Sequence, residues 1–161
     1  MNQFANAFGA KFVENKDLLR IRSFELGGHT FKVKVPLTAE IEAMYERLKV
    51  VDEATVEKYY QEISKDFQDQ EKHSNDPEVK YIDGDILIKD KSLKETAKNK
   101  LITENRITEF VRLMVPENKE FDMSEVKYSD IEELFPFAIQ LELIEHIGNC
   151  ISPNYQATKG K

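Results

Sequence analysis

Few side chains in this sequence have the type and spacing that catalysis or metal binding requires. The histidines are His29, His73 and His146, and they lie far apart along the chain. Cys150 is the single cysteine and follows His146 by four residues, so the two side chains could touch on a helix. A catalytic Cys–His pair would still need a third group that orients the base. We therefore expect Cys150 to be a buried structural thiol, and we predict no catalytic and no metal-ligating residue.

The segment Asp83-Gly84-Asp85 offers oxygen ligands to a cation, but it lacks the acidic spacing of an EF-hand loop. An Asp-Gly dipeptide between apolar residues is typical of a two-residue hairpin turn, and we interpret it so. The sequence also contains no G-x-G-x-x-G, P-loop, H-E-x-x-H or G-x-S-x-G motif. These observations favour a protein that is not an enzyme and has no cofactor.

Composition limits the classes of partner. The chain has 161 residues, of which 33% are charged, and its net charge is −7. This balance suits a helix-rich protein with well-solvated outer faces, and the acidic surface would repel a nucleic acid. One cysteine excludes an intramolecular disulfide. We therefore expect protein partners and no nucleic acid.

Hydropathy indicates the compartment. The most apolar segment, Leu134–Ile151, is interrupted by Glu142, Glu145 and His146, and so does not provide the roughly 20 mostly apolar residues that span a bilayer. The first residues lack the basic region of a signal peptide. The sequence therefore predicts a cytoplasmic protein that does not bind a membrane.

Period-two patterning predicts a hairpin near the N-terminus. Apolar residues alternate with lysines and a proline across Phe31–Leu37, and Gly27 and Gly28 before them suit the positive φ angles of a tight turn. The apolar residues before Ser23 are out of phase with those after it, so we expect a bulge or break near Ser23. A second hairpin is predicted across residues 79–89.

Helical spacing dominates the rest of the chain. Two S-x-x-E capping boxes, Ser92 with Glu95 and Ser129 with Glu132, mark helix starts. Lys100 and Glu104 fall inside the apolar stripe of the helix after Ser92. They are interpreted as an ion pair at the edge of the core or, alternatively, as a polar point in a partner groove. We expect helices over residues 38–50, 52–69, 92–115, from 129 onward, and over 136–151.

The predicted fold class is α+β and mainly helical. A small antiparallel N-terminal sheet, a β-hairpin, packs against four to five helices. We expect one globular domain over residues 1–153, an N-terminal arm over 1–17, and a flexible polar tail over 154–161.

Some apolar residues exceed what one core can hold. Phe4, Phe8 and Phe12 are spaced four apart and form one stripe on a helix. That arm could pack on its own domain or dock on a partner or neighbouring subunit. The last helix is apolar on more than one face, which indicates central burial or a shared surface. The predicted partner-binding residues are Phe4, Phe8, Leu141, Ile144, Ile147 and Ile151.

Three segments together resemble a known family. Arg22–Met44, Ile102–Met114 and Leu134–Ile147 are similar to the corresponding parts of tail assembly chaperones of long-tailed bacteriophages. The resemblance implies a non-enzymatic protein that binds the tape measure protein and promotes assembly of the tail tube protein. It also implies action in the host cytoplasm and absence from the mature virion. Homo-oligomer formation stays open.

Two other functions fit the same sequence. The chain could be a structural or connector protein of a phage particle, in which case it would be found in purified virions. It could also be an acidic regulator of a host protein, and salt would then abolish its binding.

Overall fold

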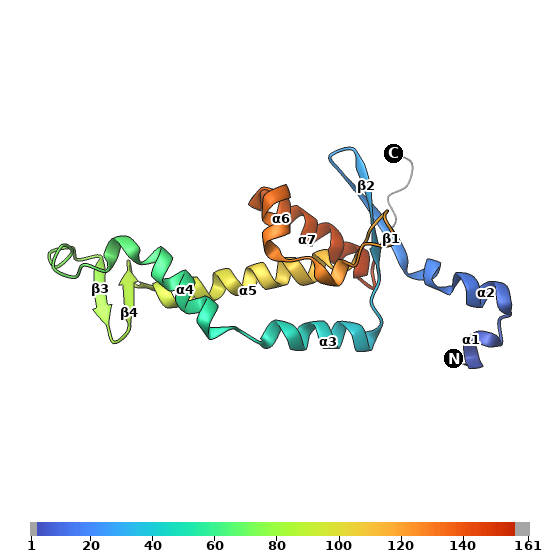
Figure 1. Cartoon of the computed structure of the whole chain (residues 1–161), viewed down its shortest axis with the longest axis horizontal. Helices are drawn as coiled ribbons and strands as arrows, with labels where there is room; N and C mark the ends of the chain where they lie inside the picture. Colours follow the sequence, from blue (N-terminus) through green and yellow to red (C-terminus); the bar gives the residue numbers. More distant parts are fainter. Residues whose placement is uncertain (1–2, 157–161) are drawn as a thin grey trace. The chain divides into compact units, whose positions relative to one another are not determined.

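The computed structural model describes residues 3–156, and within them the fold is α+β, mainly helical, as the sequence predicted (Figure 1). The chain separates into two compact units. The described residues of unit 1 are 3–43 and 107–156, and unit 2 is 44–106. The sequence predicted one globular domain over 1–153 and did not indicate this division into two units. Unit 2 has an apolar cluster of its own, which the continuous hydrophobic periodicity of the sequence does not reveal.

Both sheets are three-stranded and antiparallel, in the orders β1-β2-β6 and β3-β4-β5. The strands are β1 (Ile21–Leu26), β2 (His29–Lys34), β3 (Val79–Ile82), β4 (Asp85–Ile88), β5 (Lys91–Ser92) and β6 (Met114–Val115). The α-helices are α1 (Gln3–Asn6), α2 (Ala10–Asn15), α3 (Thr38–Lys49), α4 (Glu53–Ile63), α5 (Leu93–Val111), α6 (Tyr128–Leu134) and α7 (Phe137–Ile151). Short 3₁₀ helices are η1 (Lys16–Arg20), η2 (Lys65–Phe67) and η3 (Met123–Glu125).

The N-terminal hairpin forms where the sequence predicted it. Gly27 and Gly28 have φ angles of 60° and 78°, values that glycine adopts without steric cost. The register runs continuously from Ile21 opposite Lys34 to Leu26 opposite His29, so the predicted bulge near Ser23 is wrong. The phase mismatch has two causes: Leu19 belongs to η1 and lies outside the strand, and Ile21 lies on the face of β1 opposite to Phe24.

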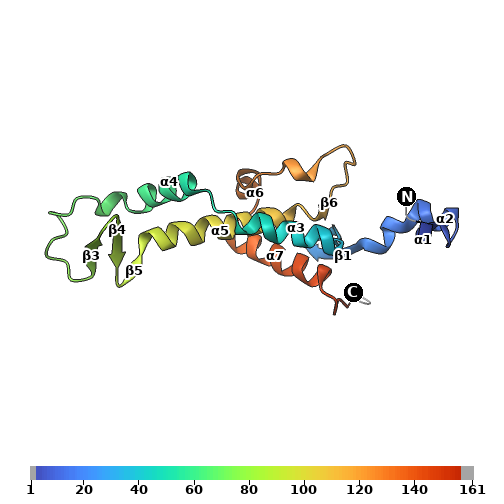
Figure 2. The same ribbon diagram turned by 90° about the horizontal axis from the view of Figure 1, so that it is seen from below.

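Helix α7 covers the β1–β2 hairpin, and the two lie side by side in Figures 1 and 2. The imidazole of His146 stacks on the Phe24 ring, with centroids 4.9 Å apart. Cys150 is buried, as predicted, and burial raises the pKa of its thiol. The buried side chains of α7 recur every three or four residues and so share one face: Gln140, Leu143, Ile147 and Cys150.

Arg22 fixes the C-terminal end of α7. Its guanidinium donates hydrogen bonds to the backbone carbonyls of Cys150 and Ser152 and lies 4.5 Å from the centroid of the Tyr155 ring. These bonds satisfy carbonyl groups that the helix itself leaves unpaired. Tyr155 of the predicted tail, 154–161, thus contacts Arg22, and the last five residues of that tail lie outside the described part of the chain.

Helix α4 ends at Ile63, before the predicted end at Asp69, and the short 3₁₀ helix η2 follows it. Two other helix boundaries also differ from the predictions. Helix α5 ends at Val111 and not at Val115, because Met114 and Val115 pair with β2 as strand β6. Helix α6 begins one residue before the expected cap, and the backbone N–H of Lys127 donates to the side chain of Asp130 at 2.9 Å. Pairing with β2 therefore sets the end of α5, and the carboxylate of Asp130 sets the start of α6. The other predicted cap is present, since the backbone N–H of Glu95 donates to Ser92 Oγ at 3.0 Å.

Unit 2 contains the second predicted hairpin, with Asp83 and Gly84 as its loop and a φ angle of 69° at Gly84. Side chains of α4, the hairpin and α5 form its apolar cluster. The buried members are Tyr60, Val79, Ile86 and Ala97, packed against Val56, Tyr59, Ile63, Phe67, Tyr81, Ile88 and Leu93.

Asp85 joins β4 to the first turn of α5. Its carboxylate accepts hydrogen bonds from the backbone N–H groups of Ile86 at 2.8 Å and Lys94 at 3.1 Å, and from the Ser92 hydroxyl. We expect Asp85→Ala to lower the free energy of unfolding by about 1–3 kcal/mol, because these donors lose their acceptor. Chemical denaturation measures this loss. Asp83→Ala is the matched control, since that carboxylate is exposed in the adjacent turn.

The hydrogen bonds to Asp85 also make the stability lost on Asp85→Ala depend on pH. Burial raises the pKa of Asp85, but the hydrogen bonds from Ser92, Lys94 and Ile86 outweigh it and hold the pKa below its usual value of 3.8. A carboxyl group whose folded pKa is lowered stabilises the fold above the pKa of the unfolded chain, and this contribution is lost as pH falls through the folded value. The gap between wild type and Asp85→Ala should therefore narrow below about pH 4. An unchanged gap in acid would contradict this role.

Candidate functional site

Two groups stand out among the exposed apolar side chains of unit 1, which also include Leu18, Leu19, Leu37 and Phe121. The first is the N-terminal segment, where Phe4 and Phe8 are 71% and 60% exposed and Phe12 is half-buried. We call these three residues the aromatic arm. The second is the junction of α6 and α7, where Leu134, Phe137 and Leu141 are 70%, 54% and 46% exposed. We call these three residues the α6–α7 strip.

The aromatic arm is ordered by ring contacts. The predicted helix over the arm is interrupted, because Gly9 adopts a φ angle of 93° between α1 and α2. The rings of Phe4 and Phe8 nevertheless meet edge to face, with centroids 5.2 Å apart, and those of Phe8 and Phe12 are 5.3 Å apart. Aromatic pairs in such orientations attract each other by more than their buried area implies. The arm therefore presents a row of aromatic rings.

The α6–α7 strip lies on a helix whose other face is core. Phe137 and Leu141 are one turn apart near the start of α7, and Leu134 ends α6 just before them. The segment that carries the strip is acidic. Tyr128–Ile151 contains no lysine or arginine, and its carboxylates are Asp130, Glu132, Glu133, Glu142 and Glu145.

The structure separates the six predicted partner-binding residues. Phe4, Phe8 and Leu141 are exposed, and Ile144 and Ile151 are half-buried. Ile147 is instead fully buried, so a partner cannot contact it in this structure.

The burial of Ile147 has a simple helical cause. It shares the face of α7 that carries Leu143 and Cys150 and that covers the β1–β2 hairpin. Sequence reasoning missed Leu134 and Phe137. The available signal was the spacing of Phe137, one helical turn before Leu141.

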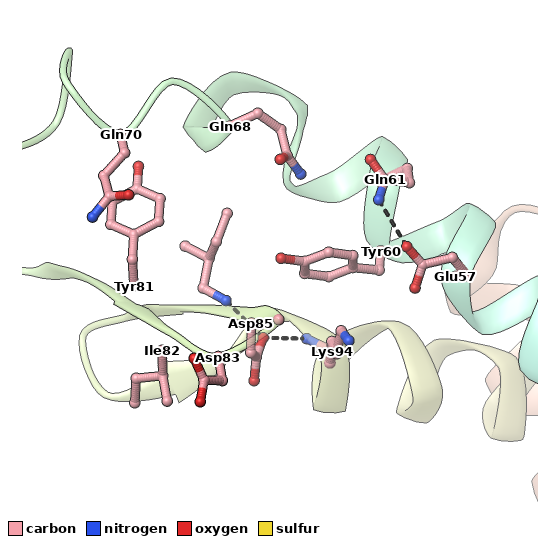
Figure 3. A pocket seen from close by; sticks show the side chains of 12 residues that line it. Glu57, Tyr60, Gln61, Gln68, Gln70, Tyr81, Ile82, Asp83, Asp85 and Lys94 are labelled. Atoms are coloured by element: carbon pink, nitrogen blue, oxygen red, sulfur yellow. Dashed lines mark hydrogen bonds between the residues drawn. The ribbon is translucent and has the colours of Figure 1, made fainter.

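Unit 2 contains a pocket of about 550 Å³ between α4 and the β3–β4 hairpin (Figure 3). The rings of Tyr60 and Tyr81 and three glutamine side chains face the pocket. The lining residues are Glu57, Tyr60, Gln61, Gln68, Gln70, Tyr81, Ile82, Asp83, Gly84, Asp85, Ile86 and Lys94.

Most polar groups of the pocket already hold the fold together. Gln61 donates to the Glu57 carboxylate at 2.8 Å, Tyr81 donates to the carbonyl of Phe67, and Asp85 caps α5. Burial raises the pKa of Tyr60, with Asp85 and Glu57 adding to the effect, so its phenol is neutral at neutral pH. Among the described residues that line the pocket there is no His, Cys, Ser or Thr. The pocket thus offers shape and hydrogen bonds and no nucleophile–base pair.

The pair predicted within α5 is present. Lys100 Nζ lies 3.9 Å from the Glu104 carboxylate and 4.3 Å from the centroid of the Tyr59 ring. The Tyr59 hydroxyl also donates to Glu104. Glu104 is buried, and this triad ties α4 to α5. The geometry fits the interpretation as an ion pair at the edge of the core.

Residues 3–156 also lack a cluster of metal-binding side chains and a helix that could cross a membrane. No group of three or more His, Cys, Asp or Glu side chains is placed to hold a metal ion. In the same residues, no helix has the length and apolar character to cross a membrane. Comparison of the chain with known proteins found no matching family model, no matching curated protein and no matching solved structure.

Proposed function

We propose that this chain is an assembly chaperone that binds an apolar helical segment of another protein through the α6–α7 strip. The observation that supports the proposal is the exposure of Leu134, Phe137 and Leu141 on a segment, Tyr128–Ile151, that has five carboxylates and no lysine or arginine. Contiguous exposed apolar side chains with a polar rim mark surfaces that bind proteins. Following the resemblance described above, the partner is the tape measure protein of a long-tailed phage, and the complex promotes assembly of the tail tube protein.

The mechanism needs no covalent step. An apolar stripe of the partner helix packs on Phe137 and Leu141, in the manner of a helix in a groove, and is thereby kept from aggregating. The surrounding carboxylates favour partner segments that carry lysine or arginine beside the apolar stripe. The chaperone would act in the host cytoplasm and leave the partner as the tube forms, so it would be absent from the mature virion.

Co-expression with the tape measure protein of the same phage tests this proposal. Wild-type chain should keep the tape measure protein in the soluble fraction and co-purify with it. Phe137→Ser with Leu141→Ser should weaken binding at least about tenfold, because two apolar contacts are lost. Val50→Ser is the matched control, since Val50 is 71% exposed and lies outside the strip. Binding affinity is measured by calorimetry on the purified complex.

Two outcomes would favour the other functions. If the chain is found in purified virions and the double variant binds normally, a structural or connector role replaces the chaperone. If moderate salt abolishes binding to a host protein while the strip variants bind normally, the chain acts as an acidic regulator.

A further inference from the structure

The aromatic arm combines exposed aromatic side chains with helices that are too short to be stable alone. Helices α1 and α2 have four and six residues, lengths at which a helix in water is marginal. No side-chain hydrogen bond caps α2 at Gly9. Phe8 is nevertheless 60% exposed and lies between two other rings. An apolar surface packed against these rings would therefore stabilise the arm.

A segment that docks on the α6–α7 strip should not be acidic. The segment Tyr128–Ile151 has a formal charge of −5, and the whole chain has a charge of −7. Most of a second copy would therefore be repelled from the strip. The segment Gln3–Phe12 is different, because its only charged side chain is Lys11. It is thus a part of the molecule that can approach the strip without electrostatic cost.

We propose that the aromatic arm of one copy docks on the α6–α7 strip of a second copy. Phe8, flanked by Phe4 and Phe12, packs against Phe137 and Leu141, and Lys11 lies among the carboxylates of the strip. Because each copy has one arm and one strip, a reciprocal exchange gives a closed dimer with two identical contacts. The dimer requires only this chain and can be tested without the partner. It covers the strip that is proposed to bind the partner, so the arm and the partner compete for Phe137 and Leu141.

Sedimentation of the purified full-length chain over a wide concentration range tests the dimer. Wild type should convert from monomer to dimer as concentration rises. Phe4→Ser with Phe8→Ser, the arm variant, should raise the dissociation constant at least about tenfold, and so should Phe137→Ser with Leu141→Ser, the strip variant. Val50→Ser should behave as wild type. Circular dichroism and thermal melting check that each variant is folded, which is expected because the substituted side chains are exposed.

Mixing the two variants identifies the contact. The strip variant keeps an intact arm and the arm variant keeps an intact strip, so the mixture should form a heterodimer through one contact although each variant alone stays monomeric. The proposal is overturned if wild type is a monomer at every concentration, as it would be if the arm closed on its own strip. It is also overturned if the dimer persists in both variants, or if mixing them restores no dimer.

Discussion

Ile147→Ala is expected to lower the free energy of unfolding by about 2–5 kcal/mol, the range for truncating a buried isoleucine. Ile147 is fully buried on the face of α7 that covers the β1–β2 hairpin, so the substitution leaves a cavity that the hairpin and helix cannot fill without moving. Denaturant unfolding, followed by circular dichroism, measures the change. The result matters for function because the sequence placed Ile147 at the partner surface.

Leu141→Ala is the matched control on the same helix. Its side chain is 46% exposed, so the stability should change by only about 0.5–1 kcal/mol. Partner binding should show the opposite pattern. Leu141→Ala should weaken binding, whereas folded Ile147→Ala should bind as wild type does. Equal losses of stability would show that α7 buries a different face from the one described.

Gln140→Leu should have the second large effect, about 2–3 kcal/mol of lost stability. The Gln140 side chain is 1% exposed, accepts a hydrogen bond from the Tyr128 hydroxyl at 2.8 Å and donates one to the carbonyl of Phe135 at 2.8 Å. It therefore connects the start of α6, the end of α6 and the first turn of α7. Leucine has a similar volume but leaves polar groups of the half-buried Tyr128 and Phe135 without these partners, which costs more than the net value of the bonds.

A double-mutant cycle tests this connection. Tyr128→Phe removes only the phenol donor and should cost about 1 kcal/mol in wild type. In the Gln140→Leu background the same change should cost less, because the bond is already lost. Unfolding experiments on the four proteins give the coupling energy. Additive effects would mean that the two side chains act independently.

Local patterns predicted most elements of this fold. The alternation over β2, the Gly27-Gly28 turn and the Asp83-Gly84 turn each depend on neighbouring residues alone, and all three are present. The apolar period of α7 likewise predicted a helix with the correct bounds. These signals are short-range, so one sequence is enough to read them.

The errors arose where a distant residue decided the outcome. Strand β6 ends α5 early because it pairs with β2, and no local pattern near Met114 indicates that partner. The core face of α7 depends on which side meets the β1–β2 hairpin, so Ile147 and Leu141 were indistinguishable in a helix that is apolar on more than one face. The exposed strip could be predicted only in part, since Leu134 and Phe137 are apolar residues whose exposure depends on tertiary packing.

Unit 1 is built from two stretches of chain, with all of unit 2 between them. Because of this arrangement, the residues of unit 2 are all synthesised before those of unit 1 are complete. The residues of unit 2 are complete when Arg106 leaves the ribosome, whereas unit 1 still lacks β6 and α7. At typical rates of protein synthesis, the roughly 45 residues that remain up to the end of α7 take about 2–9 seconds to make. For that interval the β1–β2 hairpin has no helix over Phe24 and Val33, so the nascent chain is most vulnerable to misfolding at its earliest-made sheet.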